Sequence, residues 1–300
     1  KFERSYTNST EDSSRFGIFL ENLKAADERQ LKETSVNGGG VFGITQFSDR
    51  THDEFKKLLG LKNANKFKKK NELTSCDSTV YPYVQDWSSS YARTIYNQGY
   101  CGKKVIVVHL FHIYIYRVIL LPCFMCIIMI GSCWAFASTE QVASDAIRMG
   151  IGDYSLSAEQ LVQCDTGNDG CDGGEYAPAF DYMATPSGVE TSSDYPYTSY
   201  YGITGGPCAA LSFLNVVSVT SWDDSLSGDE GCMAHYVQNT GTLAVAVDAN
   251  DWNYYEGGIM SHYSCGQDLD HAVQIVGVYP AASGGYWKIR NTWGTSWGGE

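Results

Sequence analysis

The chain has 300 residues, of which 43% are hydrophobic and 18% are charged, and its formal net charge is −13. This length allows about two domains, and the hydrophobic content is sufficient for a folded core. The negative charge argues against nucleic acid as a partner, because a phosphate-binding surface needs clustered Lys and Arg side chains. The charge is also uneven, with +2 over residues 1–79 and −15 over residues 80–300. We therefore expect two units that attract one another.

Ten cysteines are spread along the chain at spacings that do not match a metal site. Cysteines in this pattern are typical of disulfide-bonded proteins from an oxidising compartment. Cys123 and Cys126 would need two further ligands to hold a metal ion. We expect no metal and no cofactor.

The first region contains two helical patterns. A helix start is predicted at Thr10, followed by an apolar stripe of Phe16, Phe19, Leu20 and Leu23. Thr51 and Glu54 form a capping box, which predicts a short helix that ends at Gly60. The apolar residues of this second helix are Phe55, Leu58 and Leu59. The polar, lysine-rich segment 62–79 then predicts a solvated linker.

Two short segments contain residues suited to nucleophilic chemistry. Residues 97–102 read N-Q-G-Y-C-G, and residues 131–137 read G-S-C-W-A-F-A. Residues 134–147 lack Gly and Pro, which predicts a helix directly after Cys133. A thiolate is the attacking form of cysteine, and a helix N-terminus favours its negative charge. Cys133 is therefore a candidate nucleophile.

A base for this cysteine would come from far along the chain. His271 opens a β-rich run to Val278, whereas the other five histidines lack such a context. Asn291 and Trp293 follow a second strand-like segment at 286–290.

Joined together, residues 97–102 and 131–137 resemble the active-site segment of papain-like cysteine proteases. The first region resembles cathepsin L-type propeptides, whose E-R-F-N-I-N spacing is matched by Glu11, Arg15, Phe19 and Asn22. Ala26 and Gln30 depart from the last two positions of that motif. A second propeptide motif is similar to Gly43, Thr45, Phe47 and Asp49, with Thr45 in place of the usual Asn. The resemblance covers residues 11–102 and 131–300.

This resemblance implies acyl transfer by four residues. The Cys133 thiolate would attack a peptide carbonyl, and His271 would protonate the leaving amine. Asn291 would orient the imidazole, and Gln98 would donate to the oxyanion together with the Cys133 N–H. The implied substrate-binding residues are Gly173, Gly174, Tyr176, Ala246, Ala272 and Trp293, and Trp293 would also shield the His–Asn bond from water. The implied disulfides are Cys101–Cys171 and Cys164–Cys208.

The resemblance also implies an α+β, papain-like two-domain fold, with a helical left domain, a β-barrel-like right domain and the cleft between them. We expect a helical inhibitory prodomain with linker at residues 1–79 and the peptidase domain at 80–300. No His-containing insertion follows Cys171, which favours an endopeptidase. The expected partners are protein and peptide substrates and the chain's own propeptide. We expect the protein in a lysosome or a vacuole, or secreted. In the family, Cys265 pairs with a cysteine nearer the C-terminus, so we expect that this end of the domain is truncated here.

Residues 103–130 are an almost wholly apolar insert between the two active-site segments. The insert is long enough to span a bilayer, for which about 20 apolar residues suffice. A membrane span would separate Gln98 from Cys133 by about 30 Å, so that the oxyanion site could not form. A surface loop of this composition would be an aggregation hazard. We therefore expect no membrane association. The alternative is that the insert, which splits the active-site segment, makes the chain a catalytically inactive product that is misfolded or membrane-associated.

A translated intron is the interpretation we favour for this insert. Residues 102–104 can be encoded by GGTAAGAA(A/G), which contains the GTAAG of an intron start, and residues 130–131 by ATAGGN, which contains the AG of an intron end. Removal of the sequence between them restores C-G-S-C-W in frame.

Overall fold

The structure is a computed structural model that describes residues 2, 4–6, 8–62, 83–101, 131–185, 188–201, 206–211, 214–226, 228–280 and 285–299. The expected insert at 103–130 and all but the first residue of the expected linker lie outside the described residues. The expected domain boundary at residues 79 and 80 lies outside them too.

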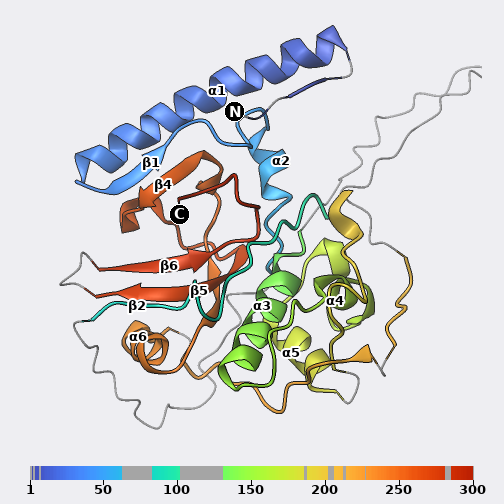
Figure 1. The fold of residues 1–300 in the computed structure, drawn as a ribbon. Helices are drawn as coiled ribbons and strands as arrows, with labels where there is room; N and C mark the ends of the chain where they lie inside the picture. The colour runs from blue at the N-terminus through green and yellow to red at the C-terminus, as the bar shows by residue number, and fades with distance from the viewer. Residues whose placement is uncertain are drawn as a thin grey trace, which may run out of the picture.

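A long N-terminal helix, α1 (Ser9–Ser35), crosses one end of the molecule (Figure 1). Its N-cap is Asn8, whose side chain accepts a hydrogen bond from the backbone N–H of Glu11. The helix therefore begins one residue before the predicted start at Thr10.

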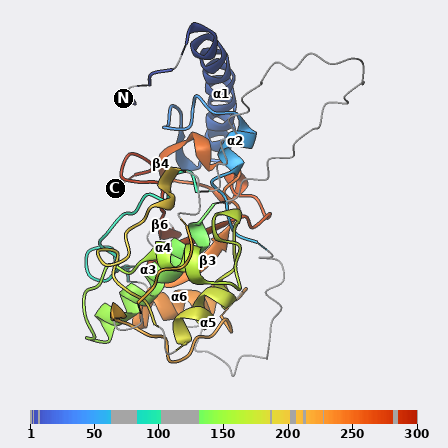
Figure 2. The same ribbon diagram turned by 90° about the vertical axis from the view of Figure 1, so that its right-hand side faces the viewer.

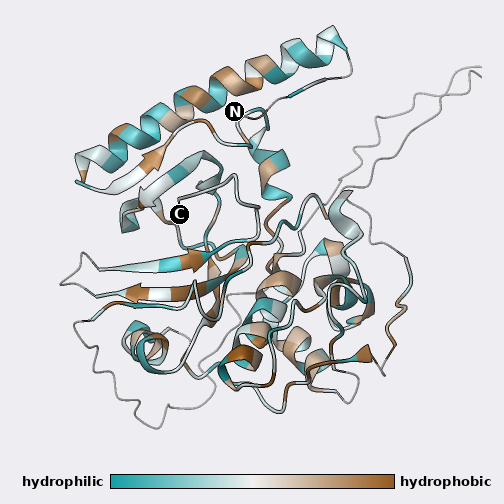
Figure 3. Cartoon of the chain, in the orientation of Figure 1, coloured by the Kyte–Doolittle hydropathy of each residue, from teal (hydrophilic) through white to brown (hydrophobic). Residues whose placement is uncertain are grey.

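The predicted apolar stripe of α1 is wrong in part. Phe16 and Leu20 are exposed, and the buried positions of the helix are Asn22, Ala26 and Glu33. Figure 3 shows polar and apolar residues interspersed along this helix. The reason is that α1 packs through polar contacts, such as the hydrogen bond of 2.9 Å from Asn22 Nδ2 to the Ser48 carbonyl.

The N-terminal region adds a strand to the C-terminal part of the chain. Strand β1 (Gly39–Phe42) pairs antiparallel with β4 (Tyr255–Ile259), and these two strands form a separate small sheet below α1 (Figure 1). No sequence motif had indicated this pairing.

Helix α2 (His52–Lys56) begins with the predicted capping box of Thr51 and Glu54. It ends at Lys56, earlier than the predicted end at Gly60. Leu58 and Leu59 are nevertheless buried, because the chain continues directly into the site described below.

Three helices form the helical half of the C-terminal part. These are α3 (Cys133–Arg148), α4 (Ala158–Cys164) and α5 (Tyr176–Ala184). Their core is centred on Trp134, Leu161 and Met183, which are all fully buried. Ser157 caps α4 through the backbone N–H of Gln160, and the spacing of these two residues in the sequence predicts a helix that leads to Cys164.

A four-stranded antiparallel sheet forms the other half. Its strands are β2 (Gln85–Asp86), β3 (Leu243–Val247), β5 (His271–Tyr279) and β6 (Tyr286–Arg290). The long strand β5 pairs with each of the other three, and helix α6 (Glu230–Asn239) packs on the sheet. Short 3-10 turns cover Gly170–Asp172, Ser199–Tyr201, Trp252–Tyr254 and His262–Ser264.

The two halves meet where α3 packs against β5, and the N-terminal region lies across one end of that junction (Figures 1 and 2). Among the described residues, no helix is both long and apolar enough to cross a membrane.

Candidate active site

Cys133 is the first residue of α3, and its side chain is completely buried. The helix dipole favours a negative charge at this position. The backbone N–H of Gly60 donates to the sulfur at 3.2 Å, and the backbone N–H groups of Ala272 and Trp134 are also hydrogen-bonded to it. Gly60 comes from the N-terminal region, so this region covers the thiol directly.

The protonation of the covered site is set by burial. Burial raises the pKa of the Cys133 thiol to about 12, although the N–H donors act in the opposite direction. Burial also lowers the pKa of His271 to about 4, against the effect of its hydrogen bond to Asn291. Near pH 7 both groups are therefore neutral, and a neutral thiol is a poor nucleophile.

His271 begins β5, and its Nε2 lies 2.8 Å from Asn291 Oδ1. The same oxygen accepts the backbone N–H of Thr292 at 2.7 Å, so the imidazole Nε2–H is the donor in the pair. The indole of Trp293 stacks on the imidazole with 4.8 Å between ring centroids. Within the described part of the chain, Nδ1 of His271 has no hydrogen-bond partner, which leaves this nitrogen free to exchange a proton.

Gln98 is buried and fixed by Thr292. Its backbone N–H donates to the Thr292 carbonyl at 2.9 Å, and its Oε1 accepts from Thr292 Oγ1 at 2.6 Å. The Nε2 donates to the carbonyl of Leu58 at 2.8 Å. A Cβ atom built on Gly131 would lie 2.8 Å from the same Nε2, so the amide is beside the segment that leads into Cys133. The structure thus brings Gln98 and Cys133 into one site.

Residues 58–62, which we name the covering segment, lie along this site. Leu61 forms a parallel bridge with Gly174. The Gly174 N–H donates to the Gly60 carbonyl at 3.0 Å, and the Lys62 N–H donates to the Gly174 carbonyl at 2.9 Å. The covering segment therefore occupies the backbone positions where an extended peptide would bind.

The side chain of Leu61 enters an apolar pocket. It is buried in a cluster with Cys133, Tyr176 and Ala272, and Ala246 packs against the same cluster. Ala246 is on β3, directly opposite Ala272 on β5. Three of the predicted substrate-binding residues thus share one pocket beside the thiol.

Two glycines allow the backbone at residues 173–174 to lie close to its neighbours at this edge of the site. Gly173 has a φ of 96°, a conformation that side chains disfavour. A Cβ atom on Gly174 would lie 2.5 Å from the side chain of Asn168 and 2.6 Å from that of Trp134. Any larger residue at Gly174 would displace its surroundings.

Two disulfides brace the site, Cys101–Cys171 and Cys164–Cys208, and these are the pairs that the resemblance implied. Cys232, for which the sequence indicated no role, is disulfide-bonded too. Among the described residues, the free cysteines are Cys133 and the exposed Cys265.

The N-terminal region is anchored on Trp293. The rings of Phe47 and Phe55 lie 5.3 and 5.4 Å from the Trp293 ring, both nearly perpendicular to it. The Gln46 side chain donates to the Trp293 carbonyl at 2.8 Å. The indole that stacks on His271 is thus also a docking surface for the N-terminal region.

Sequence reasoning missed Thr292, Glu33 and the contacts of the covering segment. Thr292 could have been noticed as the neighbour of Asn291. Glu33 is fully buried and accepts hydrogen bonds from Ser261 and Ser264, but an isolated glutamate on a helix gives no signal in the sequence.

Comparison with known proteins identifies the family. The profile described as papain family cysteine protease matches residues 128–300, more than half of the chain. The chain belongs to the papain family of cysteine proteases. The cathepsin propeptide inhibitor domain (I29) matches residues 1–55, so this papain-family protease carries its own propeptide.

Relatives of this protease extend over nearly its whole length. Cathepsin L 1 of Paramecium tetraurelia is 31% identical over 99% of the chain and 82% of the relative. Cysteine proteinase 1 of Dictyostelium discoideum is 30% identical over 99% of the chain and 83% of the relative. The solved structure of digestive procathepsin L 3 from Tenebrio molitor larval midgut has a TM-score of 0.76 at 28% identity, with coverage of 98% and 86%. These matches support a papain-like fold with an N-terminal propeptide.

Proposed function

We propose that Cys133, His271, Asn291 and Gln98 form the catalytic site of this protease, and that the covering segment holds it in a zymogen state. Residues 1–79 would be the inhibitory propeptide with its linker, and residues 80–300 the peptidase. One observation carries this proposal. The covering segment donates Gly60 N–H to the Cys133 sulfur and supplies the Leu58 carbonyl to the Gln98 amide.

The reaction is acyl transfer from a peptide to water. The Cys133 thiol gives its proton to His271 as its sulfur bonds to the peptide carbonyl carbon, and the oxyanion that forms accepts from Gln98 Nε2 and the Cys133 N–H. His271 gives its proton to the leaving amine as the C–N bond breaks, which leaves a thioester. Water then attacks the thioester, releases the carboxylic acid and restores the thiol. Asn291 keeps the imidazole in the tautomer and orientation that these proton transfers need.

Release of the propeptide would activate the thiol. The neutral state of Cys133 and His271 follows from burial, and the covering segment provides part of that burial. Once water reaches the site, the thiolate and the imidazolium can form and stabilise one another.

The pocket that holds Leu61 favours an apolar side chain in the substrate. Its walls, Tyr176, Ala246 and Ala272, present no charged group to that side chain. We therefore expect an endopeptidase that prefers an aliphatic or aromatic residue in this pocket. The disulfides fit synthesis in an oxidising secretory route, and we propose a lysosome, a vacuole or the outside of the cell as the destination.

Labelling and turnover by the acid-processed chain test the proposal. Cys133→Ala should abolish peptide hydrolysis and covalent labelling by a peptidyl epoxide. Cys265→Ala, which removes the exposed free cysteine, should leave both intact. Turnover by the Cys133→Ala variant, or epoxide attached to Cys265 instead, would show that the assignment is wrong.

A further inference from the structure

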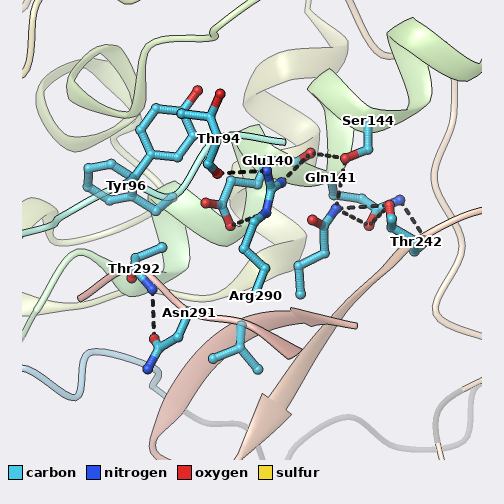
Figure 4. A network of polar contacts seen from close by, with 12 residues as sticks. Thr94, Tyr96, Glu140, Gln141, Ser144, Thr242, Arg290, Asn291 and Thr292 are labelled. Atoms are coloured by element: carbon cyan, nitrogen blue, oxygen red, sulfur yellow. Dashed lines mark hydrogen bonds and ion pairs between the residues drawn. The ribbon is translucent and has the colours of Figure 1, made fainter. Parts of the chain in front are cut away.

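A buried ion pair joins α3 to the end of β6 (Figure 4). Glu140 Oε2 lies 3.6 Å from Arg290 Nε, and the side chains are 1% and 5% exposed. Within the described part of the chain, neither carboxylate oxygen nor this Nε has a hydrogen-bond partner. Burial raises the pKa of Glu140 to about 7, although Arg290 acts against this. The loss of hydration can outweigh the attraction in such a pair, so stability alone is a weak explanation for it.

The position of the pair connects it to the proposed catalytic residues. Glu140 is on the same helix as Cys133, seven residues later, which is close to two helical turns. Arg290 is the residue directly before Asn291. The pair therefore links the helix that begins at the nucleophile to the strand that leads into the orienting asparagine.

Arg290 also contacts the segment that carries Gln98. Its guanidinium donates to the Thr94 carbonyl at 3.1 Å and to the Glu140 backbone carbonyl at 3.4 Å (Figure 4). The segment that follows Thr94 lies alongside residues 290–294. The Gly294 N–H donates to the Tyr96 carbonyl, and the Gln98 N–H donates to the Thr292 carbonyl, both at 2.9 Å.

The same arginine is paired with the strand of the proposed base. Arg290 lies opposite Gln274, three residues after His271 on β5. Through its guanidinium and its place in the sheet, Arg290 thus joins segments that carry all four proposed catalytic residues.

We propose that Arg290, held by Glu140, is a positioning residue that fixes Asn291 and the His271 imidazole relative to Cys133. The proposal deepens the function proposed above and rests on it. A small displacement of catalytic groups is expensive, since about 1 Å can reduce a rate about 100-fold. Arginine suits the task because its rigid fork reaches two carbonyl groups and the carboxylate at once, which a lysine cannot do.

The test replaces both members together, because removal of one would leave a buried charge unpaired. The acid-processed chain with Glu140→Leu and Arg290→Met, in a Cys265→Ala background, is titrated with a peptidyl epoxide to count competent sites. We expect the thermal midpoint to stay within a few degrees, kcat per titrated site to fall about 10-fold, and KM to change less than about twofold. The pH profile of Cys133 alkylation by iodoacetamide should shift as well, because the imidazole loses its fixed orientation.

Lys288→Met is the matched control. Lys288 lies on β6, as Arg290 does, and its partly exposed ion pair of 2.9 Å is with Asp86 on β2. Its loss should not change kcat. Arg290→Lys should recover only part of kcat, because the charge remains and the fork is lost.

An unchanged kcat and alkylation profile in the double variant would overturn the proposal. If that variant does not fold, Arg290→Lys decides the question, because it keeps both charges of the pair and removes only the fork. A kcat equal to that of the wild type would then overturn the proposal, and a reduced kcat with shifted alkylation would support it. Inactivity of the wild-type chain would instead overturn the proposed function and this inference together.

Discussion

Glu33 is a buried carboxylate at the contact between the propeptide and the peptidase. Its Oε1 accepts the Ser261 backbone N–H at 2.7 Å, and its Oε2 accepts the hydroxyls of Ser261, at 2.7 Å, and of Ser264. Burial opposes its ionisation, but the bonds from Ser264 and Ser261 outweigh this and hold the pKa of Glu33 below its ordinary value of 4.5.

Glu33→Gln should weaken the closed zymogen through the loss of charge alone. The amide keeps the shape, and the serine hydroxyls can turn to accept from it. Three charge-assisted hydrogen bonds become neutral ones, a loss of about 0.7 kcal/mol each or about 2 kcal/mol in all. The ratio of open to closed zymogen should then rise about 30-fold.

The rate at which a peptidyl epoxide labels Cys133 in the intact zymogen at pH 7 measures this ratio, provided that opening and closing are fast. The control is Glu28→Gln on the same helix, where the side chain is 68% exposed and the rate should stay constant.

The dependence on pH has a defined sign. A carboxylate whose pKa is lowered by folding stabilises fully above its ordinary pKa, and this contribution disappears as the pH falls through the lower folded-state value. The ratio between variant and wild-type labelling should therefore approach one in strong acid. Equal labelling rates at pH 7, or a ratio that grows as the pH falls, would refute the reasoning.

Three further predictions concern the covering segment, the base and the insert. Gly60→Ala should speed labelling of Cys133 in the zymogen, because a Cβ at this position would lie 2.0 Å from the Gly131 carbonyl oxygen and would displace the covering segment. The control is Gly17→Ala, where a Cβ would have no atom within 4 Å and the labelling rate should stay constant. Asn291→Ala should leave weak peptidase activity, with kcat reduced and Cys133 still titratable, because the residue orients the base; full activity would contradict this role. Sequencing of the mature transcript should show that the codons for residues 103–130 are absent, and a message that retains them would exclude the intron hypothesis.

Local patterns predicted the elements of the peptidase well. The stretch without Gly or Pro at residues 134–147 predicted α3, the cap at Ser157 predicted α4, and the β-rich run from His271 predicted β5. These elements depend on short-range periodicity and capping, which a single sequence contains.

The packing of the propeptide could not be predicted in the same way. The sequence indicated an apolar stripe at Phe16 and Leu20, yet α1 turns Asn22 and Glu33 toward its partners. These contacts join residues 26 to 231 positions apart, and hydrophobic periodicity carries no information on such pairs. For the same reason, the sequence did not indicate Glu33.

The disulfide between Cys101 and Cys171 has a consequence for the integrity of the chain. The segment that carries Gln98 is bonded covalently to the helical half and hydrogen-bonded to Thr292, so its place does not depend on the peptide bonds between residues 102 and 130. A cut anywhere in that interval would produce a two-chain protein that migrates as one species without reductant and as two with it. Such a nicked form would retain Gln98 beside Gly131, and the zymogen would tolerate proteolysis at that point without loss of its site.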